Sequence, residues 1–135
     1  MAEKTVRSYT KGMALAPRKV SLVASLVRGR SVEDALVILD HTPKRAALPL
    51  KKAIESARAN AVNTHALDGK TLMISTLSVT VGTRLKRFVP ASRGRALPFQ
   101  KKTSNVLIEV TGAEKPKKKP AAAAKPAAEA KEEDK

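Results

Sequence analysis

In the first half of the chain, hydrophobic residues recur at the spacing of an α-helix. A short extended segment from Val6 to Ala14 precedes Pro17, and proline suits a first helical turn because its missing N–H would be unpaired there anyway. The helix that follows is expected to bury one face and to end at Gly29. That face consists of Val20, Val23, Ala24 and Val27.

A second, shorter helix is expected from Val32 to about Leu39. Ser31 precedes it, and a serine hydroxyl at this position caps a helix by accepting a hydrogen bond from an N–H of the first turn. Glu33 and Asp34 lie in that turn, where negative charge interacts favourably with the helix dipole.

Pro43 repeats the start signal, and a third helix is predicted from Lys44 to about Asn63. Pro49 falls within its first turns. Because proline lacks an N–H and clashes with the preceding turn, we expect it to kink the helix or to delay the regular start to about Leu50.

After a turn signal at Asp68-Gly69, the period changes from helical to alternating. Leu77, Val79 and Val81 alternate with Thr76, Ser78 and Thr80, which predicts a half-buried strand with the aliphatic residues inward. A later segment places Val106, Ile108 and Val110 on one face in the same way. The two strands are natural antiparallel partners.

The connection between these strands, residues 82–103, contains no Asp or Glu, and no acid occurs between Asp68 and Glu109. A loop of this length in a compact domain is either functional or disordered. If the strands continue outward as a hairpin, each side has about eleven residues of ~3.3 Å, which places the tip roughly 35 Å from the core. The segment carries seven cations, Arg84, Lys86, Arg87, Arg93, Arg95, Lys101 and Lys102.

An isolated two-stranded ribbon is marginal in water, and like charges weaken it further. Phosphates reverse that repulsion, and the planar arginine fork binds phosphate and stacks on bases. Pro90 and Gly94 bracket the expected turn, and apolar side chains offer surface to nucleobases or ribose. These apolar residues, which favour a shaped arm over a flexible basic loop, are Leu85, Phe88, Val89, Leu97 and Phe99.

Length and charge support a polyanionic partner. The 135 residues make one domain, and 27 Lys and Arg against 12 Asp and Glu give a formal net charge of +15. Such a balance suits nucleic acid, an acidic membrane surface or an acidic protein. We expect residues 1–112 to form the globular unit and residues 113–135, drawn almost wholly from Ala, Lys, Pro and acids, to be a disordered tail.

Other kinds of site have little support. The chain has no cysteine, no apolar run of the ~20 residues that a membrane span needs, and no secretory h-region at its start. His41 and His65 lack partners at metal-ligand spacing and are interpreted as helix-end residues, and Glu55 as part of a surface charge lattice with Lys51 and Arg58. The sequence contains no catalytic motif or cofactor fingerprint, and we expect no metal site. We expect the protein to be cytoplasmic. A second basic group surrounds the first helix and comprises Lys11, Arg18, Lys19, Arg28 and Arg30.

The order of these segments resembles the ribosomal protein L22 family of the large subunit, in its bacterial form. The resemblance covers about residues 6–111 and is carried by three groups of residues. The first spans Pro17-Arg18-Lys19-Val20 to Arg28-Gly29-Arg30, the second Ala35 to Leu39 with Glu55 to Asn63, and the third, in the hairpin, Lys86-Arg87, Pro90, Arg93-Gly94-Arg95-Ala96 and Lys102-Thr103-Ser104. The chain departs from the usual pattern at Thr83, Ala91-Ser92, Leu97-Pro98-Phe99 and Pro49.

The resemblance implies an α+β fold, with a small three-stranded antiparallel sheet packed on three helices and a long protruding β-hairpin. It implies a structural constituent of the ribosome that binds 23S-type rRNA, assists subunit assembly, has other large-subunit proteins as neighbours and forms no homo-oligomer. The resemblance implies that Lys86, Arg87, Pro90, Arg93, Gly94 and Arg95 form the tip and its rRNA contacts. With the other cations found above, the expected rRNA-binding residues are Lys11, Arg18, Lys19, Arg84, Lys86, Arg87, Arg93, Arg95, Lys101 and Lys102. The implied tip, past which the nascent peptide runs in the exit tunnel, comprises Phe88, Val89, Pro90, Ala91, Ser92 and Gly94.

An architectural DNA-binding protein remains the main alternative, because a basic β-ribbon with a proline near its tip also suits a minor-groove wedge. A module for membranes or acidic proteins explains the charge but leaves the apolar residues of the arm unexplained.

Overall fold

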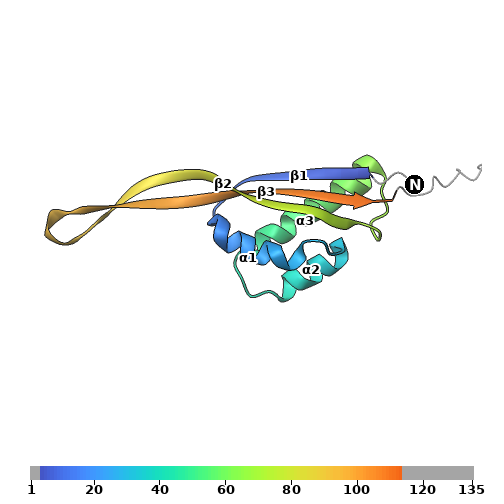
Figure 1. The fold of residues 1–135 in the computed structure, drawn as a ribbon, viewed down its shortest axis with the longest axis horizontal. Coiled ribbons are helices and arrows are strands. Elements are labelled where there is room, and N and C mark those ends of the chain that lie inside the picture. The colour runs from blue at the N-terminus through green and yellow to red at the C-terminus, as the bar shows by residue number, and fades with distance from the viewer. Residues whose placement is uncertain (1–3, 114–135) are drawn as a thin grey trace, which may run out of the picture.

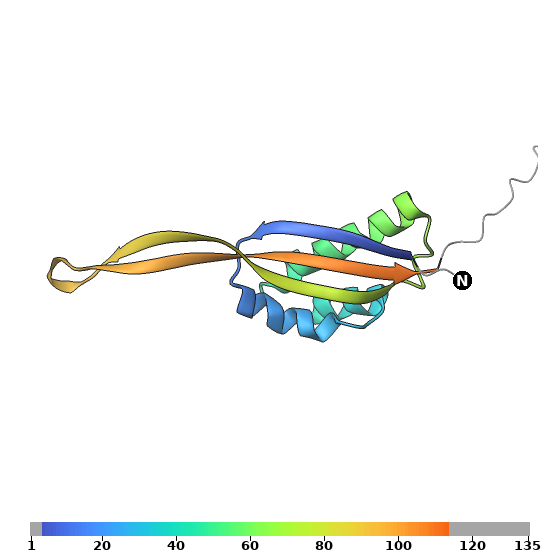
Figure 2. The same ribbon diagram turned by 45° about the horizontal axis from the view of Figure 1, so that its top comes forward.

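A computed structural model of the chain describes residues 4–113 and shows an α+β fold in which helices cover one face of an antiparallel sheet (Figures 1 and 2). The helices are α1 (Pro17–Val27), α2 (Val32–His41) and α3 (Ala47–His65). The strands are β1 (Lys4–Met13), β2 (Met73–Pro90) and β3 (Ala96–Gly112), in the order β1-β3-β2. The expected fold class is thus confirmed. All of the predicted tail except Ala113 lies outside the described residues.

The first two helices follow the sequence pattern closely. The four residues predicted to face inward on α1 are all buried, and α1 is followed by Gly29, whose φ of 70° lies in the left-handed region. The Ser31 side chain accepts a hydrogen bond from the Asp34 N–H at 3.1 Å, so the predicted cap is confirmed. His41 and His65 are the last residues of α2 and α3, which confirms their position at helix ends.

The start of α3 differs from the prediction. The helix begins at Ala47 rather than at Lys44, and Pro49 is its third residue. The first N–H groups of a helix have no partner within it, so a proline here removes no helical hydrogen bond. The regular hydrogen bonding then starts where it was expected, since the Leu50 N–H donates to the Ala46 carbonyl at 3.3 Å.

The inward face of β2 was only partly predicted. Leu77 is buried and Val79 is half-buried, but Val81 is 50% exposed. A β-bulge between Ile74 and Thr76 shifts the alternation, so that Ile74 and Leu77 both point inward. Val81 lies on the same face, opposite the buried Ser104, but its predicted burial is wrong: it is the last residue before a second bulge, between Val81 and Arg84, where the strand leaves the body.

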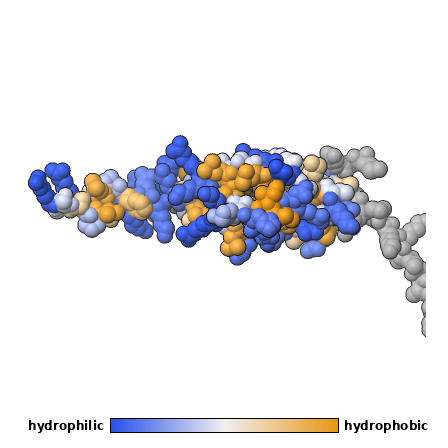
Figure 3. Space-filling model, turned by 90° about the horizontal axis from the view of Figure 1, so that it is seen from below, coloured by the Kyte–Doolittle hydropathy of each residue, from blue (hydrophilic) through white to orange (hydrophobic). Residues whose placement is uncertain are grey.

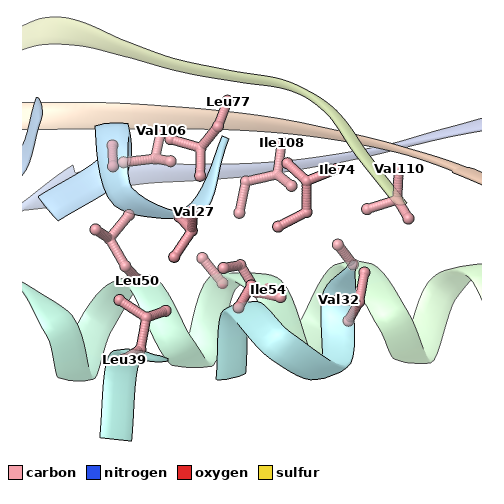
Figure 4. Packing of buried hydrophobic residues seen from close by; sticks show 14 of the residues in the cluster. Val27, Val32, Leu39, Leu50, Ile54, Ile74, Leu77, Val106, Ile108 and Val110 are labelled. Carbon is pink, nitrogen blue, oxygen red and sulfur yellow. The ribbon is translucent and has the colours of Figure 1, made fainter. Parts of the chain in front are cut away.

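The core lies between the sheet and the helices and, within residues 4–113, contains no aromatic side chain. Val106, Ile108 and Val110 point from β3 toward the helices, as predicted, and meet side chains such as Leu50 and Ile54 of α3 (Figure 4). The strand pairing is also as predicted, with Leu77 opposite Ile108 and Val79 opposite Val106. The core therefore depends on β3, the central strand, which also continues into the hairpin.

Candidate nucleic-acid interface

The hairpin predicted from the acid-free segment is present as a two-stranded arm, defined here as residues 82–103. The pairing of β1 with β3 ends at Met13 and Ser104, and beyond that point only β2 and β3 pair, out to Pro90 and Ala96. The arm projects from one end of the body in both ribbon views (Figures 1 and 2). Between 83 and 102 every residue except Ala91 is exposed, so the side chains are available to a partner on all sides.

Close packing fixes the place where the arm leaves the body. The Thr103 hydroxyl donates to the Thr83 carbonyl at 2.7 Å, and the Asn105 side chain accepts from the Gly12 N–H at 3.0 Å. A Cβ atom at Gly82 would lie 2.5 Å from the Thr103 Oγ1. Glycine is therefore required at 82 by the close approach of the neighbouring strand.

The strand register divides the arm into three zones, of which the first, at its base, is cationic. Residues directly opposite each other in an antiparallel pair share a face. Arg84 lies opposite Lys102, and Lys86 opposite Gln100, so one face of the base carries three cations. Lys101 lies opposite Leu85 on the other face. The like charges of Arg84 and Lys102 oppose the pairing of the strands.

The middle zone of the arm is apolar on both faces. Phe88 lies opposite Pro98 on one face, and Val89 opposite Leu97 on the other. Phe88 is 73% exposed, and Phe99, on the face of Val89, is 52% exposed. In the space-filling view this zone separates a polar tip from a polar base (Figure 3). Prolines are tolerated here because both strands of the arm are edge strands.

The third zone is the tip. The chain turns here between Pro90 and Gly94, as predicted. The Ala91 N–H donates to the Arg95 carbonyl at 2.7 Å and closes the loop. Arg93 and Gly94 both have positive φ, at 59° and 71°. The left-handed region is costly for a residue with a Cβ atom, so the loop carries backbone strain at Arg93. Arg93 and Arg95 bring two guanidinium groups to the end of the arm.

Within the described part of the chain, no ion pair involves a cation of the arm. Within residues 4–113 the ion pairs join Arg7 to Glu109, Lys51 to Asp40 and Glu55, and Arg58 to Glu33, and all lie in the body. With seven positive charges and no acid, the arm is suited chemically to binding several phosphates.

The second basic group is divided by the structure. Lys11, Arg18 and Lys19 are exposed; Lys11 precedes Gly12 at the arm junction, and Arg18 lines a hollow with Val79 of β2. The structure thus brings Lys11 and Arg18 near the end of the body from which the arm leaves, and the adjacent Lys19 lines a hollow between α1 and residues 42–46. Arg28 and Arg30 instead donate hydrogen bonds to the carbonyls of Leu77 and Leu26, both at 2.9 Å. These two side chains therefore make hydrogen bonds within the body.

Other candidates stay at the surface. Lys51 reaches Asp40 at 2.6 Å and Glu55 at 4.0 Å, and the hydrogen bond to Asp40 raises the pKa of Lys51. The predicted contact of Glu55 with Arg58 is replaced, since Arg58 pairs with Glu33 at 3.4 Å. In the described part of the chain, no cluster of three potential metal ligands occurs. No helix there is long and apolar enough to cross a membrane.

Sequence reasoning missed two features. It placed the ends of the hairpin at Gly82 and Thr103 but did not predict the close packing there or the part of Asn105, because these contacts depend on the strand register. It also passed over Lys44 and Arg45, which line a hollow against α1. A signal was available for the second, since residues 41–54 contain no acid.

The sequence was also compared with known protein families and with individual proteins. Residues 8–111 match the family described as ribosomal protein L22p/L17e. A relative from Oceanobacillus iheyensis is 41% identical over 78% of this chain and 93% of its own length. A relative from Lactobacillus delbrueckii subsp. bulgaricus is 42% identical over 82% of this chain and 97% of its own length. A relative from Metamycoplasma hominis is 47% identical over 81% of this chain and 84% of its own length. Each of the three is named large ribosomal subunit protein uL22.

Proposed function

Because the chain belongs to the ribosomal protein L22p/L17e family, we propose that it is a structural protein of the large ribosomal subunit and that its arm binds rRNA. The observation that carries the rRNA contact is the arm itself: seven cations and no acid on an exposed two-stranded ribbon. Phosphates bound along the ribbon offset the repulsion between Arg84 and Lys102, for which residues 4–113 supply no ion pair.

The three zones of the arm give the contact a specific form. The cations of the base and the tip bind phosphates, and the arginine forks hold them bidentately. Phe88 and Phe99, on opposite faces, offer rings on which unpaired bases stack. Lys11, Arg18 and Lys19 extend the same basic surface onto the body.

The tip is assigned to the exit tunnel and its nascent peptide by family resemblance together with its small side chains. The small residues Ala91, Ser92 and Gly94 lie at the end of the arm beside Arg93, with Phe88, Val89 and Pro90 behind them. We assign the protein no catalytic role and place it in cytoplasmic ribosomes, among other large-subunit proteins.

Sedimentation tests this proposal against a DNA-binding role. Native lysate containing the tagged chain is separated on gradients in low and in moderate salt. We expect the protein to co-migrate with the large ribosomal subunit in both, because the assembled RNA encloses the arm. Recovery with the nucleoid, or release of all the protein as free chain at moderate salt, would overturn the assignment.

A further inference from the structure

A second surface, on the body beside the base of the arm, is apolar and is not covered by residues 4–113. A hollow of about 470 Å³ lies between α1 and the segment 42–46. Leu15, Leu22, Leu26 and Pro43 are among its lining residues. Leu22 is 73% exposed and Leu26 47% exposed, although both belong to a helix whose other face forms the core. Contiguous exposed apolar surface of this kind marks an interaction site.

The hollow does not end at segment 42–46. Leu15 and Arg45 also line a neighbouring depression that contains Leu48, which is 65% exposed. Together the two hollows form one apolar groove, defined here by Leu15, Leu22, Leu26, Pro43 and Leu48. An occupant that follows this groove covers several aliphatic side chains at once.

The rim of the groove is entirely cationic. Lys19, Lys44, Arg45 and Lys52 line it, and neither hollow has an acid in its lining. No ion pair within residues 4–113 involves any of these four. An occupant that brings carboxylates beside apolar side chains therefore complements both the floor and the rim.

The lining favours polypeptide over RNA. Neither hollow is lined by an aromatic ring, whereas readers of unpaired RNA stack bases on such rings. The one hydroxyl between α1 and segment 42–46, that of Thr42, already donates to the Ile38 carbonyl at 2.6 Å. The polar edge of a base would lose its hydrogen bonds on such a floor, but an aliphatic side chain has none to lose.

Two other occupants fit less well. A second copy of this chain would bring the same positive charge, +15, toward a basic rim. Residues 114–135 contain no branched aliphatic or aromatic side chain to fill an apolar floor. We propose that the groove binds a segment of a different protein, in which apolar side chains are flanked by Asp or Glu. The inference rests on the proposed function in one respect: it places that partner inside the assembled large subunit.

Site-specific photo-crosslinking tests the groove. Benzoylphenylalanine is placed at Leu22 of the full chain, and large subunits assembled in cells are purified and irradiated. Val37, which is 58% exposed on α2 outside the groove, is the control position, and Phe99 reports on the arm. Leu26 provides a second groove position in case the first substitution disturbs α1.

We expect Leu22 to give an adduct with another protein that survives ribonuclease and maps to an apolar segment flanked by acids. The yield should fall several-fold with Lys44→Glu and Arg45→Glu, whereas Val37 should not give this adduct. An adduct from both groove positions with RNA, with a second copy or with the chain's own tail, or no adduct from either, would overturn the groove assignment. If Phe99 still crosslinks rRNA, the proposed function survives that result; if the chain never enters large subunits, both fail.

Discussion

Gly82 is a residue whose importance comes from packing, since its backbone does not require glycine's conformational freedom. Its Cβ position is 2.5 Å from the Thr103 hydroxyl oxygen and 3.2 Å from a backbone atom of the same residue. We expect Gly82→Ala to lower the free energy of unfolding by about 1–3 kcal/mol, the usual cost of overpacking, measured by urea denaturation.

Gly69→Ala is the matched control for this change. A Cβ atom there meets its nearest neighbour, in Val62, at an ordinary 3.6 Å, and its φ is not positive. Its effect should stay within about 0.5 kcal/mol. Equal losses in the two variants would show that the junction is not tightly packed.

At Ser104, in contrast to Gly82, we expect that substitution by alanine does not lower the free energy of unfolding. Its side chain is fully buried between strands, and its hydroxyl oxygen has no hydrogen-bond partner in the structure. Because an unpaired buried hydroxyl costs free energy, Ser104→Ala should leave stability unchanged or raise it by up to about 1 kcal/mol. Thermal or urea unfolding measures this directly.

Replacing Ser31 by alanine should instead lower the free energy of unfolding. The Ser31 side chain caps α2, and loss of a helix cap costs about 1 kcal/mol. If Ser104→Ala destabilises as much as Ser31→Ala, then the Ser104 hydroxyl has a partner in solution.

At the scale of elements, the arm is the least self-sufficient part of the protein. Among residues 4–113, no third strand pairs with its two strands, and cations oppose each other at its base. We expect arm amides, such as that of Lys86, to exchange with deuterium much faster in the free protein than that of Ile108. Exchange should slow in purified large subunits. Equal protection of the two amides in the free protein would contradict this view.

The arginines of the tip should affect binding without affecting folding. Arg93→Ala with Arg95→Ala removes two cations that we propose bind phosphates, so the dependence of log K on log salt for rRNA fragments should become shallower by about 0.7 for each phosphate that is no longer neutralised. Because both side chains are exposed and outside the core, the melting temperature should be unchanged.

Arg58→Ala with Lys70→Ala is the matched control, since it removes two charges near the turn after α3, on the body. It should leave the salt dependence almost as it is. A tip variant that melts at a clearly lower temperature would show that the arm belongs to the core.

At the scale of the whole molecule, folding and binding are separated in space. The buried hydrophobic residues run from Val6 to Leu77 and from Val106 to Val110, with none in the arm. Replacing residues 84–102 by a short Asn-Gly turn should therefore leave the melting of the body nearly unchanged. Incorporation into large subunits should fall sharply, as measured by sedimentation. A body that no longer folds without the arm would contradict this division.

Much of this arrangement is local and was predictable. The buried face of α1, the Ser31 cap and the alternation of β3 each depend on residues a few positions apart, and each was found as predicted. The position of the arm was predictable for a different reason. A run of cations without acids stands out in a sequence whatever the fold, so residues 82–103 could be identified by charge alone.

The sequence by itself thus determined the helices, the core positions of β3 and the extent of the arm. Only the tertiary structure decided that Val81 faces solvent, that Gly82 must lack a side chain, and that Leu22, Leu26 and Lys44 share a groove. The physical reason is the same for all three. Where a strand leaves the body, and which distant segments come into contact, depends on strand register and helix packing, which no short stretch of sequence specifies.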